Sequence, residues 1–329
     1  MALNALSVLA LLIHHGQKPV DADEALRRSF DRKPSNNVKA VVEQGGPGGR
    51  GGPMKFTMWR DSAGRRRTEV VIPLAMQGRI FIDDGVNWTT FFPDTKVLRV
   101  HPAPTDSEDM DERMKLIKDN YRLEIDSKTK VAGRSAIRVV AHPSKSNDLE
   151  TQRFYLDSST FTPLKIETVD GLGNVSVQFV VRHIEFPKNF DKSIFDLPVV
   201  DGVRREVGSP FTPLKSKEDT QRRLGFRPAM PRSLPLGFKR QAADLMDWHG
   251  ITPIGIRVSD GLVRLFVLQF KIGDGPPRPG KPGEDPKVAK TVGDIRVEVR
   301  GDGPVAVRER ILSEFVRILE SRARSQDPR

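Results

Sequence analysis

Two glycine patterns in the sequence resemble motifs that bind phosphate groups. Gly46-x-Gly48-x-x-Gly51 matches the dinucleotide-binding fingerprint as a string. That motif needs a strand before it and a helix after it, so that the pyrophosphate meets the helix N-terminus. Here a strand pattern follows, with Pro53 in the connection, which favours a flexible hairpin. Gly275-x-x-x-x-Gly280-Lys281 nearly matches a P-loop, but Pro282 stands where Ser or Thr would bind magnesium, and prolines interrupt the amide cradle.

No other pattern supports catalysis. The chain has no cysteine, which excludes disulfides, thiolate metal sites and cysteine nucleophiles. The six histidines lack metal-binding spacing, and His249 beside Asp247 fits a surface turn better than a metal site. No serine stands in a G-x-S-x-G elbow, and Asp109, Asp111 and Glu112 fall on the polar face of a predicted helix. We therefore expect no enzyme, no catalytic residues, no metal and no cofactor.

Composition indicates a globular chain with an affinity for anions. With 329 residues, 37% apolar and 29% charged, two domains are the natural expectation. The net charge of +11 attracts nucleic acid, anionic lipid head groups or lipopolysaccharide. Nucleic-acid readers combine basic clusters with aromatic residues or a recognition helix. Only 7% of the residues are aromatic and no predicted helix has a basic recognition face, which argues against nucleic acid.

The N-terminus has some features of a signal peptide. Ala2 to Ile13 form an apolar stretch with about the length of a signal-peptide core, too short to span a bilayer. A basic n-region and an A-x-A cleavage site are missing, and a mature apolar strand is the alternative. We interpret residues 1–20 as a degenerate signal peptide and expect a periplasmic or otherwise exported protein.

Residues 21–200 read as an antiparallel sheet with two helices. Asp21 and Glu24 have capping-box spacing before the first helix. A second capping box, Thr105-x-x-Glu108, begins a helix that runs towards Asn120. Short alternating segments separated by turn residues predict a meander. These strands are expected at 38–44, 54–60, 68–72, 79–83, 88–92, 97–101, 121–125, 135–141, 151–157, 164–169 and 174–186.

The remaining residues predict a linker and a smaller domain. Residues 201–232 are rich in proline, lysine and arginine and are expected to form a linker with one short helix at 216–224. Residues 233–321 predict a small α+β unit that ends with a helix beginning at Gly303-Pro304. The strands of this unit are expected at 238–246, 253–259, 262–270, 289–291 and 294–300. Residues 322–329 are a tail.

The alternation in the first sheet leaves one apolar face, for which two interpretations stay open. The face is a core covered by the two helices, or it is a half-closed barrel that holds an acyl chain or hydrophobic peptide. Four arginines flank a hairpin turn and are either solvated or placed to meet lipid phosphates at the rim. The candidate cavity residues are Phe56, Met58, Ile80, Ile82, Trp88, Phe92, Leu123, Ile125 and Phe179, and the candidate anion-binding residues are Arg60, Arg65, Arg66 and Arg67.

Several short motifs, in a consistent order, carry a family resemblance. The segment 131–140 (VAGRSAIRVV) resembles the strand pair of the LolA-like lipoprotein-carrier superfamily, and it continues into Arg153-Phe154-Tyr155-Leu156-Asp157, Pro163-Leu164-Lys165 and Asp170-x-x-Gly173. Further on, the chain resembles the C-terminal domain of the RseB/MucB regulators. The residues that carry this second resemblance are Leu234-Pro235-Leu236-Gly237-Phe238, Val258-Ser259-Asp260-Gly261-Leu262 and Val292-Gly293-Asp294.

The resemblance covers most of residues 21–320 and implies a fold and a function. The fold would be α+β, with a LolA-like antiparallel half-barrel under a helix lid and a smaller α+β C-terminal domain. The function would be a periplasmic sensor that binds lipid-like or hydrophobic peptide ligands and controls a membrane anti-sigma factor in envelope stress signalling. The alternative is a carrier of acylated lipoproteins, although carriers normally lack the second domain. The glycine-rich segment 45–53 and the proline-rich segment 273–286 depart from the family pattern.

Overall fold

The computed structural model describes residues 20–45, 53–103, 109–197, 201–209, 211–246, 251–273 and 288–326. Several features of the sequence lie outside these residues. They are the apolar N-terminal stretch, the glycine pattern at 46–51, the capping box at 105–108, the pair Asp247 and His249, and the P-loop-like segment at 275–281.

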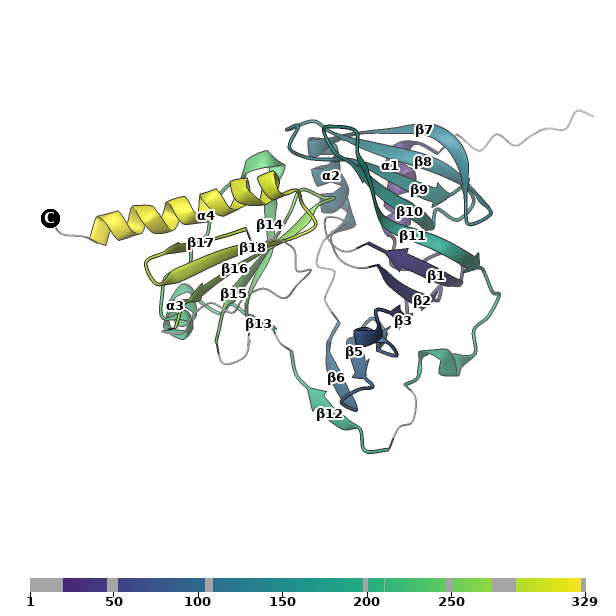
Figure 1. Ribbon diagram of the computed structural model, residues 1–329, viewed down its shortest axis with the longest axis horizontal. Coiled ribbons are helices and arrows are strands. Elements are labelled where there is room, and N and C mark those ends of the chain that lie inside the picture. Colours follow the sequence, from purple (N-terminus) through teal and green to yellow (C-terminus); the bar gives the residue numbers. More distant parts are fainter. Residues whose placement is uncertain are drawn as a thin grey trace, which may run out of the picture.

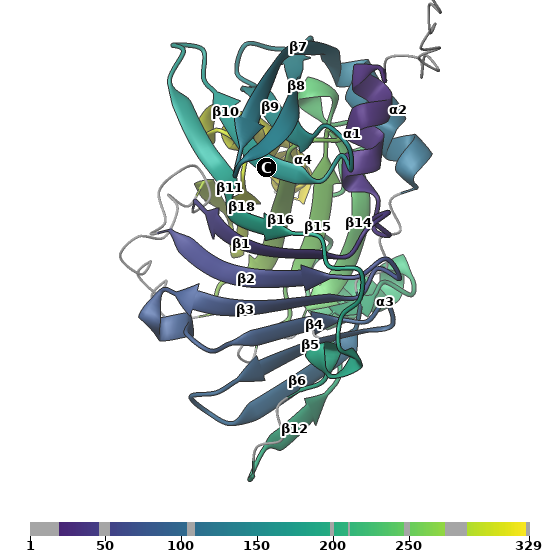
Figure 2. The same ribbon diagram turned by 90° about the vertical axis from the view of Figure 1, so that its right-hand side faces the viewer.

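The first domain is one large, almost wholly antiparallel sheet. Its order is β12-β6-β5-β4-β3-β2-β1-β11-β10-β9-β8-β7, and only β12 runs parallel to its neighbour. Figure 2 shows the strands side by side from β12 to β1. The strands are β1 (Val38–Gln44), β2 (Met54–Arg60), β3 (Arg66–Ile72), β4 (Ile80–Asp83), β5 (Asn87–Phe92), β6 (Val97–Pro102), β7 (Tyr121–Val131), β8 (Arg134–Pro143), β9 (Thr151–Asp157), β10 (Pro163–Val169), β11 (Val175–Glu185) and β12 (Arg204–Val207).

Two helices, α1 (Ala22–Phe30) and α2 (Met110–Asn120), cover one face of this sheet at its β7–β9 end. The Asp21 side chain caps α1 by accepting from the Glu24 amide at 2.8 Å, as the sequence predicts. The Asp109 side chain accepts from the Asp111 amide at the start of α2. We call the covered side the helical face; its core contains Leu26, Ile117, Val139, Phe154 and Leu156.

The opposite side, the outer face, has a small core of its own at the β4–β6 end. The short 3₁₀ helix η3 (Lys192–Phe195) lies near β3 on this side. The turn after β3 contains a second 3₁₀ helix, η2 (Leu74–Met76). The core beneath consists of Ile80, Ile82 and Phe91, with Leu98, Leu197 and Val203 packed against it.

The second domain is a six-stranded antiparallel sheet in the order β13-β14-β15-β16-β18-β17, with the long helix α4 (Val305–Gln326) lying across it (Figure 1). Val267, Val297, Ile311 and Phe315 are buried between the helix and the sheet. The other elements are β13 (Phe211–Pro213), α3 (Lys217–Leu224), η4 (Pro235–Gly237), β14 (Lys239–Met246), β15 (Ile254–Ser259), β16 (Arg264–Lys271), β17 (Val288–Val292) and β18 (Ile295–Gly301).

The segment expected to be a linker contributes to both sheets. Its strand β12 pairs with β6 of the first domain, and β13 pairs with β14 of the second. Its helix α3 begins after Ser216, whose hydroxyl accepts from the Asp219 amide, in agreement with the expected helix. The two strands were not predicted because each has at most four residues, so neither shows a recognisable alternation.

Candidate ligand-binding face

Strand register decides which of the candidate residues share the helical face. Met58 pairs with Thr68, and Thr68 pairs with Phe81. Asp83 lies two residues beyond Phe81 and pairs with Trp88. Because residues two apart on a strand point to the same face, Met58 and Trp88 share one face. The same reasoning places Phe56, Met58, Trp88, Phe92, Leu123, Ile125 and Phe179 on the helical face.

Ile80 and Ile82 lie on the outer face, which corrects the predicted alternation at β4. Ile80 pairs with Phe91 and Ile82 with Thr89, so even-numbered residues of β4 stand opposite odd-numbered residues of β5. The sequence pattern predicts Ile82 and Trp88 on the same face of the sheet, whereas the register places them on opposite faces. A shift of one residue moves a side chain to the other face, and a four-residue strand has too few positions to reveal it.

The helical face changes character along the sheet. Leu123 packs in the core beneath α1 and α2, while Phe56, Met58 and Phe179 belong to a second apolar cluster around β1. Towards β5 the aromatic rings meet cations instead. The Trp88 ring lies 5.4 Å from the Arg66 guanidinium, and arginine guanidinium groups lie about 5 Å from the Phe92 ring. Apolar contact therefore dominates beneath the helices, and cation–π contact dominates at the far end.

The four candidate arginines divide between the two faces. Arg60 and Arg66 form a pair in the β2–β3 register and lie on the helical face. Arg60 donates to the main-chain oxygens of Asp31 and Arg32. Burial, reinforced by the charge of Arg66, lowers the pKa of Arg60 to about 10, so the side chain is still a cation at neutral pH.

Arg65 and Arg67 point to the outer face and hold η3. The Arg65 guanidinium lies 4.4 Å from the Phe195 ring. Arg67 is buried and donates to the main-chain oxygens of Ile194 at 3.0 Å and Asp196 at 2.6 Å. These contacts give Arg65 and Arg67 structural roles, and anion binding by the four arginines stays a prediction.

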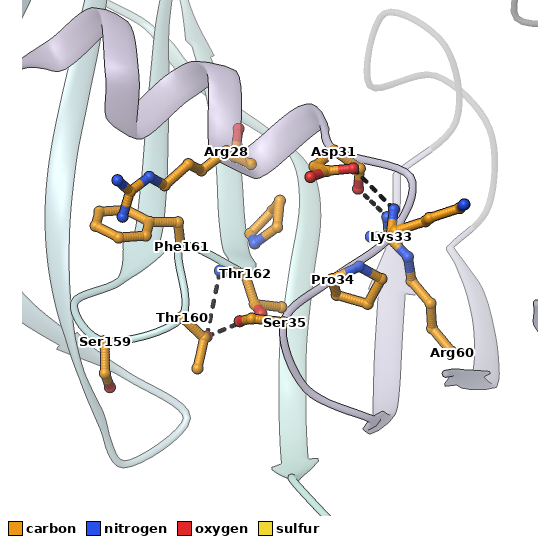
Figure 3. A pocket seen from close by; sticks show the side chains of 12 residues that line it. Arg28, Asp31, Lys33, Pro34, Ser35, Arg60, Ser159, Thr160, Phe161 and Thr162 are labelled. Carbon is orange, nitrogen blue, oxygen red and sulfur yellow. Dashed lines mark hydrogen bonds between the residues drawn. The ribbon is translucent and has the colours of Figure 1, made fainter. Parts of the chain in front are cut away.

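Two pockets lie where α1 ends, and Arg60 lines both. The first, of about 340 Å³, lies between the end of α1 and the turn at 159–163; Arg28, Lys33 and Arg60 supply its cations (Figure 3). Arg28 also stacks on the Phe161 ring at 5.1 Å. The second pocket, of about 170 Å³, is lined by Phe30, Arg32, Arg60, Gly64, Arg66 and Asp83.

Asp83 fixes the wall of the second pocket. The residue is 6% exposed, and its carboxylate pairs with Arg32 at 2.5 Å and Arg66 at 3.6 Å. Arg28, Arg32, Lys33 and Asp83 were not among the predicted site residues. The cluster of basic residues at the end of the first predicted helix was the available signal. The distant partners Arg60 and Asp83 become neighbours only through the strand order.

Within the described part of the chain, no group of three His, Asp or Glu residues is arranged to hold a metal ion. The helices described there are also not long and apolar enough for any of them to cross a bilayer.

Comparison with known proteins points to one family. Residues 51–199 match the model of the MucB/RseB N-terminal domain. A complex of MucA and MucB from Pseudomonas aeruginosa contains a chain with TM-score 0.63 and 15% identity, and the match covers 88% of this chain and 96% of that one. No curated protein matches the sequence.

Two further solved structures share the fold, with similar TM-scores and sequence identities. One is MucB in complex with MucA(peri), at TM-score 0.60 and 16% identity, covering 89% of this chain and 97% of that one. The other is MucB alone, at TM-score 0.61 and 16% identity, covering 89% and 96%. The matches span both sheets, and together with the match of residues 51–199 to the family model they make this chain a MucB/RseB-like protein.

Proposed function

We propose that this protein is a non-enzymatic regulator that binds the exported part of a membrane anti-sigma factor and works outside the cytoplasm. The observation that carries the proposal is the shared arrangement of both domains with MucB, a protein solved together with MucA. The second domain favours a regulator over a lipoprotein carrier, because carriers of the LolA-like superfamily, which the first domain resembles, normally lack such a domain.

Binding to the anti-sigma factor is the first test. The full chain is mixed with the purified exported segment of a membrane anti-sigma factor from the same organism, and complex formation is measured by calorimetry and by protection of that segment from proteolysis. We expect a complex and slower cleavage. A scrambled segment of the same composition is the control. Cleavage at an unchanged rate, with no heat of binding, would overturn the proposal.

We further propose that the first domain is a half-barrel whose helical face receives an acyl chain or a hydrophobic peptide. Apolar side chains line this face beneath α1 and α2 and around β1, and cationic pockets lie at the end of α1. An acyl chain between sheet and helices, with its phosphate near Arg60, would satisfy both environments.

Native mass spectrometry of the purified protein tests the ligand class. A co-purifying mass that extraction identifies as an acyl lipid supports the proposal. A protein that keeps its unliganded mass in the presence of phospholipid, lipopolysaccharide and hydrophobic peptides would show that the helical face is a closed core. Transfer of a bound acylated lipoprotein to an acceptor membrane would instead favour the carrier.

A further inference from the structure

The two domains meet at a buried polar contact formed by the end of α2. Asn120 is the last residue of α2, and Tyr121 begins β7 without an intervening loop. Both side chains reach the second domain, where they meet the turn at 259–263 and the 3₁₀ helix η4. We call this contact the joint and define it by Asn120, Tyr121, Gly237, Asp260 and Gly261.

The joint contains hydrogen bonds that are shielded from water. The Asn120 amide, 1% exposed, donates to the main-chain oxygens of Asp260 at 2.9 Å and Gly237 at 3.3 Å. The Tyr121 hydroxyl donates to the Asp260 carboxylate at 2.7 Å. The other oxygen of that carboxylate accepts the amides of Leu262 and Val263. Because Asp260 is fully buried, loss of the Tyr121 donor would leave an uncompensated polar group in the interior.

Two glycines let α2 approach the backbone of the second domain closely. Gly261 has φ +104°, and a Cβ there would lie 2.6 Å from Ile117 Cγ1 and 2.9 Å from the Ile117 main-chain nitrogen. Gly237 has φ +77°, and a Cβ there would lie 1.9 Å from Asn120 Oδ1. A side chain at either position would push α2 away.

The same helix forms part of the proposed ligand site. Ile117 contacts Gly261, and it also packs with Leu26, Phe154 and Leu156 on the helical face. Arg113 donates to the Gly261 main-chain oxygen at 3.1 Å and stacks on the Phe30 ring at 3.7 Å. One turn of α2 therefore contacts the sheet, α1 and the second domain at once.

We propose that α2 transmits ligand occupancy of the helical face to the orientation of the second domain. The inference rests on the proposed function. Met114 and Ile117 of α2 are buried in the core against α1 and the sheet, so a ligand that enters there must displace the helix. Since the joint fixes the end of α2 to Asp260 and η4, the displaced helix must either carry the second domain with it or break the joint. In both cases the relation between the two domains changes.

The test measures a distance between the domains with and without lipid. The chain has no cysteine, so Thr129→Cys in β7 and Ser313→Cys in α4, both exposed, give two unique spin-label positions. The probe is palmitoyl lysophosphatidylglycerol, and its binding is measured separately by native mass spectrometry. We expect one narrow distance distribution without the probe and a shifted distribution with it.

Breaking the joint should uncouple the two events. In the Asn120→Ala, Tyr121→Phe variant we expect a broader distance distribution without lipid and no further shift with it. The probe should bind on the order of a hundredfold more tightly, because the variant removes three hydrogen bonds and the net contribution of each corresponds to a factor of about five. Tyr121→Phe alone, which keeps the ring, should change the distance distribution and the affinity in the same direction but by less. This single variant provides the test if the double variant does not fold.

Asp148→Ala is the matched control. Asp148 forms a 2.6 Å ion pair with Arg310 across the domains, but this pair is partly exposed and does not involve α2. We expect wild-type binding and a wild-type shift. Lipid binding without any change in distance, or an undiminished shift in the joint variants, would overturn this inference alone. If the wild-type chain binds no lipid at all, the ligand proposal fails and this inference fails with it.

Discussion

Asp157 is a fully buried carboxylate at the end of β9 with a dense set of donors. The Arg134 guanidinium lies 2.8 Å from one oxygen, and the other accepts the amides of Ser159 and Thr160 at 3.0 Å. Burial acts to raise the pKa of Asp157, but Arg134 and the Ser159–Thr160 donors outweigh it and lower the pKa to about 2. The carboxylate form therefore stabilises the folded state.

This carboxylate predicts a defined loss of stability in acid. A pKa lowered on folding stabilises the protein above the unfolded value of 3.8, and the stabilisation disappears as the pH falls towards 2. The shift corresponds to about 2 kcal/mol at neutral pH. In urea unfolding, Asp157→Asn should lower the free energy of unfolding by about this amount at pH 7, and the difference should vanish near pH 2.

Asp126→Asn is the control for this prediction. Asp126 also pairs with an arginine, Arg138, but is about a third exposed, so its contribution should be smaller. An Asp157→Asn difference that persists unchanged down to pH 2 would mean that packing at this turn, not the ionised carboxylate, determines its stability.

Trp88 and Ile82 lie on opposite faces of adjacent strands and should separate binding from folding. Ile82→Ala removes a buried side chain from the outer-face core and should cost about 2–4 kcal/mol of unfolding free energy without changing lipid binding. Trp88→Ala removes a partly exposed ring from the helical face. It should reduce the free energy of lipid binding by more than it reduces the free energy of unfolding. Thermal melts with and without lipid measure both effects. Equal changes in both melts for Trp88→Ala would remove Trp88 from the binding site.

At the scale of elements, local signals in the sequence predict the positions of most helices and strands. Asp21 and Ser216 begin their helices as expected, because a capping side chain acts within three residues of its own position. The alternating segments at 38–44 and 54–60 became β1 and β2. The family motifs also indicated a two-domain α+β chain, and the match to MucB covers both domains.

The remaining elements depend on partners that are distant in the sequence. The face of Ile82 is set by the register with β5, and β12 is a strand only because β6 lies beside it. The pocket residues Arg28, Arg60 and Asp83 come from one helix and two strands that the strand order brings together. No local pattern contains that information, so the sequence-based site included Ile80 and Ile82 and omitted Arg28, Arg32 and Asp83.

The turn at η4 provides a prediction with a matched glycine pair. Gly237 and Gly225 both have positive φ, so alanine at either should cost about 1 kcal/mol in backbone strain. At Gly237 the new Cβ also collides with Asn120, whereas at Gly225 it meets only the flexible Lys271 side chain at 3.8 Å. Gly237→Ala should therefore lower the unfolding free energy well beyond Gly225→Ala and broaden the interdomain distance. Equal effects of the two substitutions would contradict the close approach of α2 to η4.

At the scale of the whole molecule, the two cores share residues across the domain boundary. Leu149, in the loop between β8 and β9 of the first domain, belongs to the core of the second domain and is 3% exposed. Leu262, in the second domain, packs against the core beneath α1 and α2. Each core is therefore completed by a side chain from the other domain, which predicts that the domains stabilise one another.

Leu149→Ala tests the stabilisation that the second domain receives from the first. Removing a buried leucine should cost about 2–4 kcal/mol, and because the cavity forms in the core of the second domain, the loss should be measured there. Hydrogen exchange of the β16 and α4 amides should accelerate, while exchange in β1 and β2 stays near the wild-type rate. Leu172→Ala, at an 89% exposed position in the β10–β11 turn, is the control and should change neither set. Faster exchange in β1 and β2 alone would mean that Leu149 stabilises only the first domain. The second domain would then not be held as a rigid body that a displacement of α2 could reorient.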